Sequence, residues 1–140
     1  MTWVGWALLS AFFAAMTALL AKLGVAHVDP NLATAVRTTV VVLFAWAIAV
    51  GFGGTRELST LDRRTMLFLG ASGVATALSW LCYFRALALG PASKVAPLDK
   101  LSVVFVLVLA WPVLGERPSL MTFVGGGMLT LGAIVLTLAR

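Results

Sequence analysis

Five apolar runs constrain the fold of this 140-residue chain more than any other feature. An α-helix needs roughly 20 predominantly apolar residues to cross the hydrocarbon core of a bilayer, and each run is close to that length. The runs are continuous and lack the polar alternation of a water-filled barrel. The sequence therefore predicts an all-α integral membrane protein with five transmembrane helices, at residues 3–21, 31–52, 65–89, 92–115 and 118–139.

The composition agrees with this class. Hydrophobic residues make up 61% of the chain and charged residues only 11%, whereas an average soluble domain carries about 25% charged residues. The longest polar connection, residues 54–64, is too short for a soluble domain. The first run begins Met-Thr-Trp, without the basic region of a cleavable signal peptide, so it is expected to be retained. We expect one transmembrane domain over residues 1–140.

Local signals predict where several helices begin and end. Asp29 followed by Pro30 is typical of a cap and first turn, and Ser59 to Asp62 (STLD) has the spacing of a capping box. Gly115 closes the fourth run. Pro97 lies early in that run, so the helix either begins near Pro97 or bends there, and the late start is the simpler interpretation.

Catalysis and nucleic-acid binding find no support in the sequence. His27 is the only histidine and Cys82 the only cysteine, and neither stands near residues that would complete a metal site or a catalytic group. We therefore expect no enzyme, no metal and no cofactor. The net charge of +5 is not gathered on a polar segment with interleaved aromatic residues, which points to lipid headgroups and membrane topology and away from nucleic acid.

Besides Lys94 at the start of the fourth run, four charged residues fall inside the apolar runs, near the same membrane face: Arg37, Arg85, Asp99 and Lys100. A charge at the centre of a membrane helix costs about 3 kcal/mol. None of the four has an opposite charge three or four positions away, so Asp99 is predicted to pair with Arg37 or Arg85 of another helix. The remaining cations either line a polar cavity that receives an anionic group of a solute, or extend to the interface and meet lipid phosphates and water.

Two further surfaces are candidates for function. One face of the third helix carries Trp80, Tyr83 and Phe84 together with Thr76, whereas Arg85 points elsewhere. This face would stack against an apolar or cationic solute, or pack against a helix or form an interfacial belt. The last helix offers small residues for close intramolecular packing or for a dimer contact, namely Gly125, Gly126, Gly127, Gly132 and Ala133.

The positive charges do not favour one orientation in the membrane. With five spans, one side receives Arg56, Arg63, Arg64 and Arg117. The other side receives three cations in loops and at helix ends, or six when those embedded in the runs are included: Lys22, Lys94 and Arg140, then Arg37, Arg85 and Lys100. Orientation normally follows a clear excess of Lys and Arg on the cytoplasmic side. A chain with so weak a bias is able to insert both ways.

The run RALALGPASKVAPLDKLSVVFVLVLAWPVLGERPS, followed by a glycine-rich last helix, resembles the EamA family of the drug/metabolite transporter superfamily. APLDKLS and LGER stand at the spacing found in that family, and the resemblance extends over the whole five-span layout. It implies a solute carrier, usually an exporter of metabolites, with no bound cofactor. Most members look like two fused five-helix repeats of opposite orientation, whereas this chain has one repeat.

Together these features predict a bacterial inner-membrane transporter of small metabolites or drug-like solutes. We expect it to act as a homodimer of five-helix repeats, with antiparallel insertion as one form, because inverted repeats place the substrate site at their interface. Its partners would be membrane lipids and a small-molecule solute. The candidate pathway or gating residues are Arg37, Trp80, Tyr83, Phe84, Arg85, Asp99 and Lys100, with a bend at Pro97. The alternative is a small accessory subunit that needs a separate partner and transports nothing alone.

Overall fold

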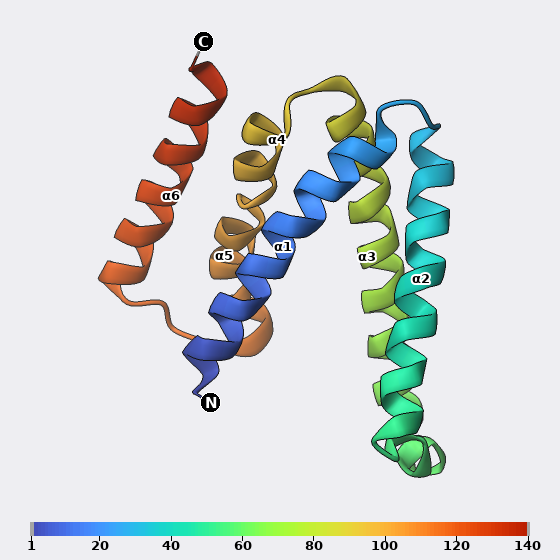
Figure 1. The fold of residues 1–140 in the computed structure, drawn as a ribbon. Helices are drawn as coiled ribbons and strands as arrows, with labels where there is room; N and C mark the ends of the chain where they lie inside the picture. The colour runs from blue at the N-terminus through green and yellow to red at the C-terminus, as the bar shows by residue number, and fades with distance from the viewer. Residues whose placement is uncertain (1, 140) are drawn as a thin grey trace. The chain divides into compact units, whose positions relative to one another are not determined.

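The computed structural model describes residues 2–139, without the side chains of Arg56, Glu57 and Ser59, and this part of the chain is built from helices (Figure 1). In order they are α1 (Trp3–Val25), α2 (Pro30–Gly51), the 3₁₀ helix η1 (Gly54–Thr60), α3 (Arg63–Leu89), α4 (Ala92–Asp99), α5 (Ser102–Leu114) and α6 (Leu120–Leu138). Helices α1, α2, α3 and α6, and the consecutive pair α4 and α5, are each long and apolar enough to cross a membrane. The predicted all-α class with five spans is confirmed.

The chain divides into two compact units, which are described separately. One comprises residues 1–20 and 89–140, and the other residues 21–88. In the first unit, α6 packs along both α4 and α5 (Figure 1). In the second, η1 packs against α2, and α2 meets α3 through side chains.

Close packing in the first unit depends on small residues of α6. Gly126 and Ala133 are buried, and a Cβ atom added to Gly126 would lie 3.1 Å from Leu107 Cδ1 of α5. Small residues allow this approach of helix backbones. Of the small residues predicted to form a packing surface, Gly126 and Ala133 are thus buried. The other three are open, because Cβ atoms at Gly125, Gly127 and Gly132 would have nothing within 4 Å.

Two of the predicted helix boundaries are confirmed by their hydrogen bonds. The Asp29 carboxylate accepts from the backbone N–H groups of Asn31 at 2.9 Å and Leu32 at 3.1 Å, and Pro30 opens α2. These bonds satisfy N–H groups that have no partner within the helix. At the other end of the fourth run, Gly115 adopts the left-handed conformation at φ 72° and ends α5.

The start of α3 differs from the prediction. The capping box predicted from Ser59 is wrong, because Ser59 lies within η1 and α3 begins at Arg63; its side chain is outside the described part of the chain. Asp62 itself caps the helix, since its Oδ1 accepts from the Thr65 N–H at 3.1 Å. Hydrogen bonds from the Thr65 side chain and backbone hold the pKa of the Asp62 carboxyl below its ordinary value.

The fourth span is interrupted after Pro97. A helix start near Pro97 is wrong, because α4 begins at Ala92 and includes this proline. Pro97 has no N–H to donate to the carbonyl of Ser93, one turn earlier. The chain then leaves α-helical geometry at Lys100 and Leu101, where the Leu101 N–H donates to the Leu98 carbonyl at 3.0 Å in a tighter turn. The helix is thus interrupted three residues after Pro97, and a bend at Pro97 itself stays a prediction.

Few apolar side chains are buried within the described chain. The buried ones are mostly small: Ala18, Ala21, Val25, Phe84, Leu87, Ala110 and Ala133. Many large apolar residues along every span are exposed, with Leu89 at 87% and Trp3 at 81% among the most exposed. Apolar faces of this extent require lipid or another membrane segment to cover them.

Candidate functional site

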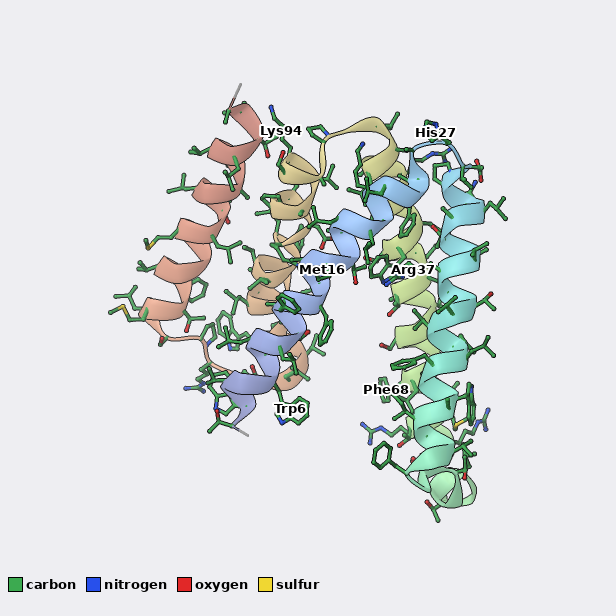
Figure 2. All side chains as sticks on the ribbon, viewed as in Figure 1. Trp6, Met16, His27, Arg37, Phe68 and Lys94 are labelled. Atoms are coloured by element: carbon green, nitrogen blue, oxygen red, sulfur yellow. The ribbon has the colours of Figure 1, made fainter. Side chains whose placement is uncertain are left out.

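Arg37 of α2 rests on an aromatic ring of α3. Its side chain extends from α2 (Figure 2), and the guanidinium carbon lies 3.4 Å from the centroid of the Trp80 ring. The same carbon lies 5.9 Å from the Phe84 ring. At the shorter distance the planar guanidinium lies against the face of the indole, where the ring's electron density attracts a cation. The two helices are thus joined by a cation–π contact that the sequence analysis did not predict.

The aromatic residues beneath Arg37 form the cluster that the helical spacing predicts. Trp80 stands edge-on to Tyr83, with ring centroids 5.6 Å apart, and lies tilted against Phe84 at 5.9 Å. Such edge and tilted arrangements are the favoured geometries of aromatic pairs. Phe84 is buried, whereas Trp80 and Tyr83 are half-buried. The three rings therefore form one contact cluster, and the buried Phe84 connects it to the interior of the unit of residues 21–88.

The stack lowers the cost of placing Arg37 in a membrane helix without removing it. Cation–π contacts contribute about 0.5–2 kcal/mol, against about 3 kcal/mol for a charge near the centre of a membrane helix. Arg37 is half-buried and lies within α2. It therefore retains a positive charge that needs a further polar or anionic neighbour.

Asp99 forms an ion pair with its chain neighbour Lys100. Lys100 Nζ lies 3.6 Å from Asp99 Oδ2, and the two side chains are 56% and 37% exposed, respectively. Both residues stand at the interruption between α4 and α5. The pairing predicted between Asp99 and Arg37 or Arg85 would join the two units and stays a prediction.

Two other residues of α3 that the sequence singled out are not part of the stack. Arg85 is exposed on α3, and the Thr76 hydroxyl donates to the Ser72 carbonyl of its own helix at 2.9 Å. Lys94 is half-buried on α4. His27 lies exposed in the turn between α1 and α2 (Figure 2). The structure thus brings Arg37, Trp80, Tyr83 and Phe84 together, and their role in a pathway stays a prediction.

Lys22 has a structural role that the sequence analysis missed. Its Nζ donates to the carbonyl of Leu87 in the last turn of α3, at 2.6 Å. Within a continued helix this carbonyl would accept from residue 91, which is Pro91 and has no N–H. A cation at the carbonyl end of a helix also favours the helix dipole. The signal was present in the sequence, as a proline four residues after Leu87 and a lysine at the end of the first run.

A small pocket lies at the far end of α2 from the stack. It has a volume of about 240 Å³ and is lined by Ala45, Trp46, Ala49, Gly54, Thr55 and Leu58. These residues belong to α2 and η1. Among the residues whose side chains the structure describes, none of the predicted pathway residues and no charged group lines it.

The chain resembles known transporters over almost its whole length. The model of the EamA-like transporter family matches residues 1–138. A protein of Sinorhizobium sp named "Uncharacterized transporter in cobO 3'region" is 48% identical over 135 residues, which cover 96% of this chain and 96% of that protein. No solved structure matches. With five helices in its described part that are long and apolar enough to cross a membrane, the chain is a multi-pass membrane transporter and belongs to the EamA-like transporter family.

Proposed function

We propose that the chain exports small metabolites or drug-like solutes as a homodimer of five-helix repeats, inserted antiparallel in a bacterial inner membrane. The observation that carries this proposal is that the described part of the chain has five helices long and apolar enough to cross a membrane. The two-repeat transporters that it resembles carry ten. Because inverted repeats build the substrate site at their shared interface near the middle of the membrane, a second copy of opposite orientation would complete the site.

Two features of the chain support this assembly. The exposed apolar faces of its helices leave ample surface for a second membrane segment as well as for lipid. The positive charges of the two sides are nearly balanced when the embedded cations are left out, at four against three. Since a Lys and Arg excess normally fixes orientation, near balance permits both orientations of the same chain.

Efflux from liposomes tests the proposal. The purified protein, with no other protein present, is reconstituted into liposomes loaded with a mixture of small metabolites, and the released compounds are identified by mass spectrometry. We expect release of one or more compounds above the level of protein-free liposomes, and a native mass that corresponds to two chains. Folded protein that releases nothing alone, and gains activity only with a different membrane protein, would favour an accessory subunit instead.

A further inference from the structure

We propose that Arg37, held on the ring of Trp80, binds a carboxylate or phosphate group within the membrane. The group is supplied by the transported solute or by the headgroup of an anionic lipid. Where the solute supplies it, the inference rests on the proposed transport function and names the class of substrate: small organic anions with an apolar body.

The stack lies well inside two of the helices that are long and apolar enough to cross a membrane. Arg37 follows Pro30, the first residue of α2, by seven residues, and Trp80 precedes Leu89, the last residue of α3, by nine. At about 1.5 Å per residue, these separations correspond to roughly 10 Å and 14 Å along the two helices. A hydrocarbon core is about 30 Å thick. The guanidinium contacts the ring of Trp80, a residue no nearer to the end of its helix than Arg37 is to the start of its own, whereas a snorkelling side chain meets polar groups at the interface.

The stack leaves the binding edge of the guanidinium available. Arginine presents five N–H donors in the plane of the group, and a ring against the face of that plane does not accept from them. Among the described residues of the unit 21–88, Arg37 makes its contacts with the Trp80 and Phe84 rings and forms no hydrogen bond or ion pair. Five donors and a full positive charge thus stand in an apolar surrounding without an acceptor from that unit.

Within the unit 21–88, the acidic residues whose side chains the structure describes cap helices. Asp29 caps α2 and Asp62 caps α3. Glu57 lies in η1, beyond the end of α2 remote from Arg37. Asp99 is the one acidic residue within the five spans, and it is paired with Lys100. An anion from outside this unit is the group best able to meet the charge of Arg37, and the test below separates a bound solute or lipid from Asp99.

The chemistry of the stack selects the kind of ligand. A guanidinium edge binds a carboxylate or a phosphate through two parallel N–H···O bonds. The half-buried rings of Trp80 and Tyr83 stand beside it and offer apolar surface to the body of a solute. A cationic solute is disfavoured, because Arg37 already covers the face of Trp80 and would repel a second cation.

Probes that share one ring and differ in charge test this inference by binding alone. The thermal unfolding midpoint of the purified protein in phosphatidylcholine nanodiscs is measured against rising concentrations of benzoate, benzylamine and benzyl alcohol. A ligand that binds the folded state raises the midpoint by mass action. We expect benzoate to raise it at lower concentration than the other two probes. Arg37→Gln should weaken the affinity for benzoate at least tenfold.

A matched control separates this site from general attraction of anions to arginine. Arg64 lies over the Phe68 ring at 5.7 Å, on the exposed first turn of α3 (Phe68 is labelled in Figure 2). Arg64→Gln removes the same charge and should leave the affinity for benzoate within twofold of the wild type. Arg37→Lys keeps the charge and loses the two-pronged edge, so it should bind benzoate three- to tenfold more weakly. This variant also serves if Arg37→Gln does not fold.

Changing the lipid of the nanodiscs distinguishes a bound lipid headgroup from a bound solute. If a lipid headgroup occupies the site, replacing part of the phosphatidylcholine by phosphatidylglycerol will raise the midpoint of the wild type and not that of Arg37→Gln, with or without an effect of benzoate. The inference is overturned if neither benzoate nor phosphatidylglycerol distinguishes the wild type from Arg37→Gln. It is also overturned if Asp99→Asn raises the affinity for benzoate tenfold, since Asp99 would then be the native partner. Efflux that persists in either case would leave the transport function standing.

Discussion

Replacing Gly126 by valine tests the contact between α6 and α5. A Cβ atom at this position would lie 3.1 Å from Leu107 Cδ1. A favourable contact between two carbon atoms is about 3.5–4.0 Å, so this distance is too short. Valine adds two methyl groups beyond that atom, and extra methylene groups in a packed site cost about 1–3 kcal/mol. We expect the free energy of unfolding to fall by about that amount. Gly127→Val is the matched control, because a Cβ at Gly127 has nothing within 4 Å, and its effect should stay within about 0.5 kcal/mol.

The assay is reversible unfolding of the purified protein in mixed micelles, by titration with sodium dodecyl sulfate and circular dichroism of the helices. A double-mutant cycle with Leu107→Ala isolates the contact, since residues in contact couple by about 0.5–3 kcal/mol. Shortening Leu107 should restore part of the stability lost by Gly126→Val. Equal effects of the valine substitutions at Gly126 and Gly127, or additive effects in the cycle, would refute the packing argument.

Three further predictions address the charged groups. Lys22→Met removes the donor to the Leu87 carbonyl. In the same micelle assay it should lower the free energy of unfolding by about 1.5–3 kcal/mol, the range for hydrogen bonds to charged groups. An unchanged free energy of unfolding would show that this bond contributes nothing. The pKa of the Asp62 carboxyl is lower in the folded chain. The ionised carboxylate therefore stabilises the fold fully above the ordinary aspartate pKa of about 3.9, and this stabilisation is lost as the pH falls through the lowered pKa. Asp62→Asn should reduce the fall in the free energy of unfolding at acid pH, and an unaltered pH dependence would contradict this. Arg37→Ala and Asp99→Asn should both reduce efflux from liposomes at matched reconstitution, and normal efflux by both folded variants would remove these residues from the pathway.

Hydropathy and run length predict most of this fold because the bilayer imposes them. A span must satisfy its backbone hydrogen bonds internally and be apolar over roughly 20 residues, and both requirements are visible in the sequence. The Asp29 cap could also be predicted from the sequence. Aspartate is favoured at the N-cap and proline at the first helical position, so Asp29-Pro30 indicates a helix start. At Ser59 the same kind of local signal failed, since the nearer Asp62 provides the cap that α3 uses.

The candidate site was predicted only in part, because it depends on contacts between helices. Helical spacing placed Trp80, Tyr83 and Phe84 on one face. Spacing within one helix carries no information about which side chain of another helix covers that face, so the position of Arg37 on Trp80 came from the structure. The interruption at Lys100 could not be predicted from the sequence either. Pro97 indicates which backbone hydrogen bond is lost, but not the residue at which the helix ends.

Accessibility of a tag at the C-terminus tests the antiparallel dimer most directly. A cysteine tag is added after Arg140 in a Cys82→Ser background, and intact cells or sealed vesicles are labelled with a membrane-impermeant thiol reagent from each side in turn. If the chain inserts in both orientations, comparable fractions of the molecules will be labelled from the two sides. Labelling of all molecules from a single side would contradict it.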